Sequence, residues 1–214
     1  MTHTEELELL LTHYSTLTPF QHQQVERLFP LYVEWNQKIN TISRKDIEHL
    51  YLHHVLHSMA ITQVVRFSPG SRVADVGTGG GFPAIPLAIL FPETHFLLID
   101  SVGKKLTVAR DVAHTIGLHN VSFFHSRAEE VKEKVDFVVS RAAMSLPNLV
   151  KCASHLIRKE CINAMPNGFI CLKGGDLAEE LRAYRKEVEE YPLESFFPYD
   201  YYKEKKIIYL PISL

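Results

Sequence analysis

The sequence predicts an α/β protein in which one mainly parallel β-sheet is covered by helices. From residue 72 onward, short apolar runs rich in β-branched residues alternate with longer amphipathic segments, the pattern of strands joined by crossover helices. A glycine-rich segment, Gly77 to Gly81, follows the first of these runs. Before residue 68 only helical periodicity is found. We therefore expect a helical N-terminal extension, residues 1–67, packed on a sheet domain, residues 68–214.

Composition narrows the kind of protein. With 214 residues, 46% of them hydrophobic and 22% charged, the chain can bury one sizeable core. The 23 basic and 25 acidic side chains nearly cancel, so a nucleic acid would have to be bound by a local basic surface. The sequence shows no signal-peptide pattern and no apolar run of membrane-spanning length, and its three cysteines lack metal-site spacing. We expect a cytoplasmic monomer without a metal or a membrane segment.

The first 67 residues are predicted to be helical. After a short amphipathic start at residues 5–14, apolar side chains recur every three or four residues. Pro30 lies inside this repeat and should kink the helix or divide it in two. The same periodicity returns over residues 46–65. The first apolar face comprises Val25, Leu28, Phe29, Tyr32, Trp35 and Ile39.

Five strands and four helices are expected to alternate after residue 72. The strands are predicted at Val73–Gly77, His95–Asp100, Val121–His125, Asp136–Ser140 and Phe169–Lys173. The helices are predicted at Pro83–Leu90, Lys104–Ile116, Leu146–His155 and Leu177–Tyr191. Two further strands, Leu193–Asp200 and Lys206–Ile212, flank a charged turn and should form an antiparallel hairpin. The predicted sheet therefore has seven strands, five of them parallel.

The glycine-rich segment is the strongest functional signal. Its glycines permit positive φ and let a ligand approach the backbone. A dinucleotide fingerprint is excluded because Phe82 stands where G-x-G-x-x-G needs its last glycine, and a Walker loop is excluded because no Gly-Lys-Ser/Thr is present. The remaining pattern, D-x-G-x-G-x-G from Asp75 to Gly81 through Gly77, Thr78 and Gly79, resembles motif I of class I S-adenosylmethionine-dependent methyltransferases. A tight turn that binds nothing remains the alternative.

Two further strand ends suit the adenosine part of such a cofactor. Asp100 ends the second strand about 20 residues after the loop, where an acid accepts the ribose hydroxyls. Its alternative role is to cap the helix that begins near Lys104. The third strand is followed by Ala128 and Glu129, whose backbone can bracket the adenine.

The next two strands end in cations. Arg141 ends the fourth strand and Lys173 the fifth, so both are expected at the same edge of the sheet. Together they would form a local basic rim suited to phosphates. Each is alternatively an ordinary solvated charge or a partner of Glu129 or Asp176.

The residues after the fourth strand limit the chemistry of a methyl transfer. The segment Ser140–Ala143 lacks the D/N-P-P-Y/F motif on which methylation of exocyclic amino groups usually relies. No cysteine there can act as the nucleophile that methylation of a pyrimidine carbon needs. The acceptor should therefore be nucleophilic already, as guanine N7 is, and catalysis can rest on positioning. We assign no general base and regard Arg141 as the best candidate for a positioning residue.

Two other groups of residues leave their role open. His53, His54 and His57 form H-H-x-x-H, which places two imidazoles on one helical face as zinc ligands would be. The glutamate of H-E-x-x-H and a third ligand are missing, so partly buried or surface histidines are favoured over a metal site. Trp35, Asn36 and Asn40 are expected to pack on the core or, alternatively, to serve an RNA or cofactor cleft.

Taken together, the motifs resemble the bacterial 16S ribosomal RNA guanine-N7 methyltransferases of the RsmG or GidB family. The Gly-Phe-Pro-x-Ile-Pro extension of the glycine loop is far more specific than the glycines alone. The likeness extends from about residue 30 to residue 175. It rests on Trp35-Asn36 with Asn40, His54 with Ser58, and the segments Asp75–Pro86, Asp100–Lys105, Arg127–Glu129, Ser140–Ala142 and Leu172–Gly174.

The resemblance implies a Rossmann-like class I methyltransferase sheet, S-adenosylmethionine as cofactor, and small-subunit ribosomal RNA or the 30S particle as partner. It also implies site residues. The cofactor contacts would fall on Asp75, Gly77, Thr78, Gly79, Gly81, Phe82, Asp100, Ala128, Glu129 and Arg141, and the RNA contacts on Lys104, Lys105, Arg141 and Lys173. One departure is His57, where the family often has Asp.

Two other functions remain open at this point. A small-molecule methyltransferase on the same fold agrees with the near-neutral charge. A non-catalytic RNA- or ribosome-binding module would need a degenerate cofactor site. The intact glycines and the acid at position 100 are evidence against that module.

Overall fold

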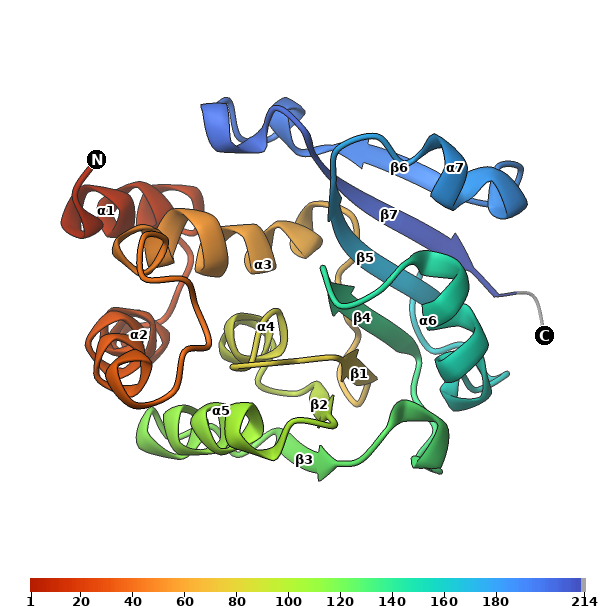
Figure 1. Ribbon diagram of the computed structural model, residues 1–214, viewed down its shortest axis with the longest axis horizontal. Helices are drawn as coiled ribbons and strands as arrows, with labels where there is room; N and C mark the ends of the chain where they lie inside the picture. The colour runs from red at the N-terminus through yellow and green to blue at the C-terminus, as the bar shows by residue number, and fades with distance from the viewer. Residues whose placement is uncertain (213–214) are drawn as a thin grey trace.

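The computed structural model describes residues 1–212. Its strands form one sheet in the order β3-β2-β1-β4-β5-β7-β6 (Figure 1). The first five run parallel, β7 pairs antiparallel with β5, and β6 pairs antiparallel with β7. This confirms the predicted seven-stranded sheet with a C-terminal antiparallel hairpin. The strands are β1 Arg72–Val76, β2 His95–Asp100, β3 Val121–His125, β4 Phe137–Arg141, β5 Gly168–Gly174, β6 Glu189–Pro192 and β7 Lys205–Pro211.

Each face of the sheet has its own hydrophobic core, because successive side chains of a strand point to opposite faces. Val73, Phe96 and Phe137 belong to the core shared with the N-terminal helices. Their neighbours Ala74, Leu97 and Val138 belong to the core on the other side. These strands are buried on both faces, which explains why they are continuous apolar runs in the sequence.

Four α-helices and one irregular helical stretch cover the first face (Figure 1). The α-helices are α1 His3–His13, α2 Pro19–Lys38, α4 Ala84–Leu90 and α5 Gly103–Thr115. The stretch contains a 3₁₀ turn at Ile47–His49, a π-helical segment at Leu50–Leu56, α3 at His57–Met59 and a second 3₁₀ turn at Ala60–Gln63. No helix within residues 1–212 is long and apolar enough to cross a membrane.

Helix α2 continues through Pro30 as one element, so of the two predicted outcomes, a kink or a division into two helices, the division does not occur. Proline has no N–H to donate to the carbonyl four residues earlier, which here belongs to Glu26. The hydroxyl of Tyr51 donates to that carbonyl oxygen at 2.9 Å. A side chain from the next helical stretch thus satisfies the group that Pro30 leaves without a partner.

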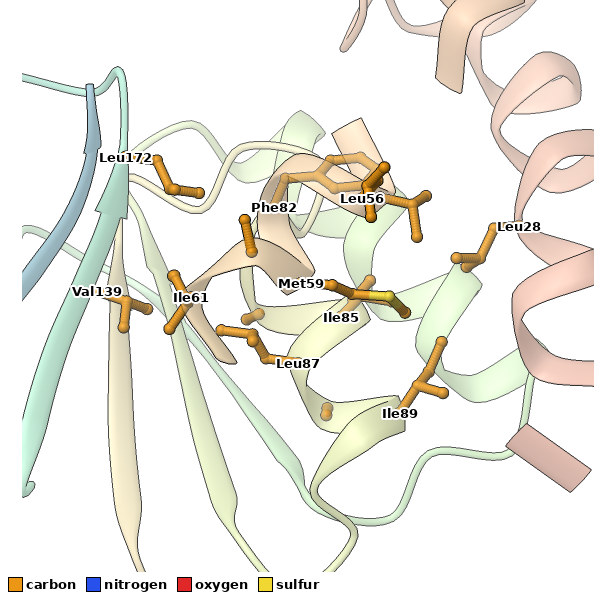
Figure 2. Close-up of a cluster of buried hydrophobic side chains, with 14 of the residues drawn as sticks. Leu28, Leu56, Met59, Ile61, Phe82, Ile85, Leu87, Ile89, Val139 and Leu172 are labelled. Atoms are coloured by element: carbon orange, nitrogen blue, oxygen red, sulfur yellow. The ribbon is translucent and has the colours of Figure 1, made fainter. Parts of the chain in front are cut away.

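The helices and the sheet share their core on this face. Figure 2 shows Leu28 of α2, Met59 of α3, and Ile85 and Ile89 of α4 within one buried cluster. Val139 and Leu172 of the sheet belong to the same cluster. The domain boundary between residues 67 and 68 stays a prediction, and residues 213 and 214 of the expected second domain lie outside the described part of the chain.

The other face carries α6 at Leu146–Ala153 and α7 at Ala178–Leu181, with 3₁₀ turns at Ala128–Glu130, Ser154–Leu156 and Arg182–Tyr184. The predicted helix over residues 177–191 is therefore too long. Residues 185–190 are mostly charged and exposed, so a helix there would have no apolar face to bury. The chain instead turns into the edge strand β6, which obtains its hydrogen bonds from β7.

The predicted strand over residues 193–200 is wrong as well. Two 3₁₀ turns, at Leu193–Ser195 and Asp200–Tyr202, occupy this region. Leu193, Phe197 and Tyr202 are buried, and the Tyr202 hydroxyl donates to the carbonyl of Leu52 at 2.6 Å. This segment packs against the helical stretch before the sheet. The C-terminal region is thereby in contact with the N-terminal helical extension.

Candidate cofactor and substrate site

The carboxyl ends of β1, β2 and β3 open into a cavity of about 500 Å³. This is the edge where an open parallel sheet binds its ligand, next to the switch in strand order between β1 and β4. One wall comes from the strand ends and the other from α6 and the loop before it. The lining residues are Val76, Gly77, Ile99, Asp100, Ser101, Ser126, Arg127, Ala128, Glu129, Met144, Asn148, Lys151 and Cys152.

The glycine loop after β1 adopts backbone conformations that other residues rarely adopt. Gly77, Gly79 and Gly81 have φ of 74°, 56° and 105°. A Cβ on Gly77 would lie 2.5 Å from that of Ala143, and one on Gly81 would lie 2.4 Å from Cδ1 of Ile85. A Cβ on Gly79 would meet nothing within 4 Å. Close packing therefore requires glycine at 77 and 81, whereas the space at Gly79 is open to a ligand.

Asp75 stabilises this loop from behind. Its carboxylate is buried and accepts hydrogen bonds from the Thr78 hydroxyl at 2.7 Å and the Ala84 amide at 3.0 Å. Burial raises the pKa of Asp75 to about 7. Neither Asp75 nor Thr78 lines the cavity, so both shape the loop rather than face the cofactor space.

Asp100 lines the cavity and also organises its backbone. One carboxylate oxygen accepts the Gly79 amide at 2.8 Å and the other accepts the Val102 amide at 2.7 Å. Each oxygen has a second lone pair, so the group can still accept hydroxyls from the cavity. The two roles suggested for Asp100, ligand and support of the next helix, are compatible.

The other predicted cofactor residues fall into two groups. Ala128 and Glu129 line the cavity beside Ser126 and Arg127. Gly81 and Phe82 are buried at the start of α4, and neither is among the lining residues. Some of the predicted cofactor residues therefore line the cavity, and the others support the loop beside it.

Sequence reasoning missed the wall formed by α6. Asn148, Lys151 and Cys152 lie three and four residues apart in α6, so they share one helical face turned to the cavity, and Met144 of the preceding loop adds to the same wall. Their position directly after a strand end was the available signal. No motif marks them, because their residue types are ordinary for a helix surface.

A second missed contribution comes from α2. The Tyr32 hydroxyl donates to the carbonyl of Gly80 at 2.7 Å, and the Tyr32 ring packs on Phe82 with centroids 4.8 Å apart. Periodicity assigned Tyr32 only to an apolar helix face. The helical extension thus holds the glycine loop directly. Trp35 packs against the core and donates to Asp111, and Asn36 accepts the amides of residues 41 and 42. Asn40 is exposed, so its predicted packing on the core is wrong.

Arg141 points away from the cavity, toward the helical stretch before the sheet. Its guanidinium lies 2.9 Å from Nδ1 of His54, donates to the carbonyl of His53 at 3.3 Å, and stacks 5.1 Å above the Phe82 ring. Because Arg141 can only donate, Nδ1 accepts, and Nε2 of His54 carries the proton that it donates to Asp46 at 2.6 Å. Burial lowers the pKa of His54 to about 4, which keeps this imidazole neutral.

The histidines do not form a metal site. His53 is paired with Asp46 and stacked on Tyr201, with ring centroids 3.8 Å apart. Both ring nitrogens of His57 are buried without a hydrogen-bond partner, and burial lowers the pKa of His57 well below its usual value. Within residues 1–212 no group of three or more His, Cys, Asp or Glu side chains is arranged to hold a metal ion.

The predicted RNA-binding lysines occupy different environments. Lys104 is exposed and Lys105 half-buried at the start of α5. Lys173 is turned inward, where it forms an ion pair with Glu180 at 2.9 Å and donates to the carbonyl of Met144. Its partner is thus neither Glu129 nor Asp176. The structure does not bring Lys173 and Arg141 together into one exposed basic rim.

The strand order, the glycine loop and the acid at the end of β2 define a class I methyltransferase fold. The chain is similar to the solved TrmN from Thermus thermophilus, with a TM-score of 0.58 at 16% identity over 87% of this chain and 53% of that one. It is also similar to a precorrin-6y C5,15-methyltransferase from Geobacter metallireducens, with a TM-score of 0.55 at 13% identity over 73% and 88%. At these identities the likeness establishes the fold alone.

The particular family follows from closer relatives. A sequence model of the family GidB, described as rRNA small subunit methyltransferase G, matches residues 21–204. Ribosomal RNA small subunit methyltransferase G of Parabacteroides distasonis is 55% identical over 97% of this chain and 90% of its own length. The corresponding protein of Bacteroides thetaiotaomicron is 52% identical over 96% and 100%. The chain belongs to the GidB family of methyltransferases, as the sequence motifs predicted.

Proposed function

We propose that this protein transfers the methyl group of S-adenosylmethionine to N7 of one guanine in 16S ribosomal RNA. The observation that carries the proposal is the cavity at the carboxyl ends of β1 to β3, lined by Gly77 and by Asp100, whose carboxylate accepts the Gly79 amide, in a chain of this family. The names of its relatives support ribosomal RNA as the acceptor. Because that RNA is cytoplasmic, we place the protein there, acting on the RNA or the 30S particle.

The residues present fit the cofactor. Gly79 leaves open space beside its backbone for the methionine part, Gly77 lines the cavity, and Asp100 offers lone pairs to the ribose hydroxyls. Ala128 and Glu129 would bracket the adenine against the α6 wall. When bound, S-adenosylmethionine supplies an electrophilic methyl group on a sulfonium.

The protein's task is then to position the acceptor. Guanine N7 carries a lone pair in the plane of the ring, so no proton has to leave before transfer and no general base is needed. The loop after β4, residues 142–145, follows Arg141 directly in the chain and contributes Met144 to the cavity wall, and we place the entry of the acceptor base beside it. We assign Arg141 to positioning, through its contacts with Phe82 and His54.

Lys104 and Lys105 suit the RNA backbone best. They lie in the first turn of α5, directly after the strand that carries Asp100, where ammonium groups can reach phosphates near the cavity. Arg141 and Lys173 could contact phosphates only after exchanging their present partners for them. We propose a monomer, since one chain supplies the whole cavity wall.

Mass mapping of 16S ribosomal RNA from cells with and without the protein tests the proposal. We expect the loss of one N7-methylguanine in the absence of the protein, and its return when wild-type protein is restored. A Gly79→Val variant should not restore it. An unchanged set of methylated guanines would contradict the proposal.

The near-neutral charge favours one second candidate, a small-molecule methyltransferase. Purified protein incubated with labelled cofactor separates the two. Transfer to undermethylated small-subunit RNA or particles supports the first function. Transfer to metabolite extracts in place of RNA supports the second.

A further inference from the structure

The loop from Ala142 to Ser145 joins β4 to α6 and forms part of the cavity. Met144 lines the cavity, and the Ala143 methyl group touches the backbone of Gly77 in the glycine loop. Ala142 has φ of 52°, a conformation that alanine rarely adopts. Interactions elsewhere must therefore hold this loop in place.

One partly buried ion pair supplies such interactions. A carboxylate oxygen of Glu180 accepts the Leu146 amide at 2.7 Å and lies 2.9 Å from the Lys173 ammonium. The same ammonium donates to the carbonyl of Met144. The two charged side chains therefore bind the backbone on both sides of Ser145. Lys173 binds the carbonyl before it, and Glu180 binds the amide after it.

The ion pair is shielded from solvent. The side chains of Lys173 and Glu180 are 10% and 21% exposed, so water screens their attraction less than at the surface. Lys173 lies in β5, within the rigid sheet, and Glu180 lies in α7. Lys173 thus anchors the loop to the sheet, and Glu180 anchors it to α7. No residue of α7 lines the cavity.

We propose that Glu180 is a positioning residue for the cofactor site: with Lys173 it holds the loop at residues 142–145 in the shape that places Met144 at the cavity. The inference rests on the proposed function, because it assumes that the cavity binds S-adenosylmethionine. It assigns a role to α7, which no motif marks. It also explains why Lys173 is turned inward.

Isothermal titration calorimetry with S-adenosylmethionine tests the role without RNA. We expect Glu180→Ala to weaken cofactor binding about tenfold, the change that loss of a hydrogen bond to a charged group produces. Glu180→Gln should have a smaller effect, because its amide oxygen can still accept from Leu146. Glu179→Gln is the matched control, since Glu179 is exposed and its side chain pairs with the exposed Arg182 at 3.5 Å. It should bind the cofactor as wild type does.

A second measurement separates positioning from plain stability. Hydrogen exchange of the protein without cofactor should become faster in Glu180→Ala at the amides of residues 142–149, while the amides of β1 and β2 stay protected. In methyl transfer, KM for the cofactor should rise with kcat nearly unchanged at saturation. A variant that unfolds at lower temperature yet binds the cofactor with wild-type affinity would overturn the inference.

A double-variant cycle tests whether the two charges act together. If they grip the loop as a unit, Lys173→Met and Glu180→Ala combined should weaken binding no more than the stronger single change. Multiplied effects would contradict the pairing. Wild-type protein that binds the cofactor but methylates no RNA would contradict the proposed function alone, because the binding measurements judge Glu180 independently.

Discussion

Gly77 and Ala143 are in contact across two loops that bound the cavity at the carboxyl ends of β1 to β3. A Cβ placed on Gly77 would lie 2.5 Å from the Cβ of Ala143, a distance at which one of the loops must move. Gly77 also has φ of 74°. The loop after β1 and the loop after β4 are therefore positioned by one another.

Gly77→Ala should reduce methyl transfer and stability together. A left-handed alanine costs about 1–2 kcal/mol, and the contact with Ala143 adds about 1–3 kcal/mol of overpacking unless the loop shifts. The control is Gly70→Ala, because Gly70 has φ of 82° but open space around a Cβ. Urea unfolding and initial rates measure both effects. Equal stability of the two variants would contradict the contact.

Gly79→Val should abolish cofactor binding while the protein stays folded. A Cβ on Gly79 meets no protein atom within 4 Å, so the substitution fills the open space that we propose for the cofactor and adds backbone strain of about 1–3 kcal/mol. Gly70→Val carries comparable strain away from the site. Calorimetry with S-adenosylmethionine distinguishes them. If Gly79→Val bound the cofactor normally, the loop would not line its site.

Asp75→Asn should change how stability depends on pH. Burial raises the pKa of Asp75 to about 7, so the native state holds this proton more tightly than the unfolded state, whose aspartate titrates near 3.9. The stabilisation is full below about pH 4 and is lost as the pH rises through about 7. The variant, which cannot titrate there, should lose less unfolding free energy between pH 4 and pH 8, by on the order of a few kcal/mol. Parallel wild-type and variant curves from urea unfolding would contradict a buried, proton-holding Asp75.

Arg141→Ala should slow methyl transfer and raise the pKa of His54. After burial, the nearby positive charge of Arg141 is a further cause that lowers this pKa to about 4, whereas the hydrogen bond to Asp46 raises it. Removing the guanidinium takes away one lowering cause and frees Nδ1. An NMR titration of the His54 ring measures the pKa, and we expect the rate to fall about tenfold.

Arg141→Lys serves as the comparison for that variant. It keeps a positive charge but cannot reach both His53 and His54 with a planar fork. We expect a low His54 pKa with a reduced rate. If both substitutions left the rate unaltered, Arg141 would have no part in the site.

Much of the site could be predicted because its parts are local. One strand, the loop after it and the next strand contain Asp75, the glycines and Asp100. Their spacing in the sequence therefore predicts that they lie close together in the fold. The lysine at 173 shows the limit of this reasoning. Its place at a strand end was predicted correctly, but its partner Glu180 lies in another element, and a solvated phosphate ligand and a buried ion pair look alike in a sequence.

The prediction of a helix over residues 177–191 was too long for a related reason. The charged segment before β6 has helix-forming residues, yet it lacks an apolar face, and the sheet edge offered by β7 decides its structure. In the same way, the Tyr51 hydroxyl donates to the Glu26 carbonyl that Pro30 leaves without a partner. No local sequence pattern predicts a donor 25 residues after that carbonyl.

The sequence by itself determined the α/β class, the places of the five parallel strands along the chain, the family and the residues of the glycine loop, because periodicity and short motifs encode them. Only the tertiary structure decided which charges are free and which are paired, that Asp75 supports the loop from behind, that Tyr32 holds Gly80, and that α6 supplies the second wall. Those features depend on contacts between elements far apart in the chain, where geometry rather than residue type selects the partner.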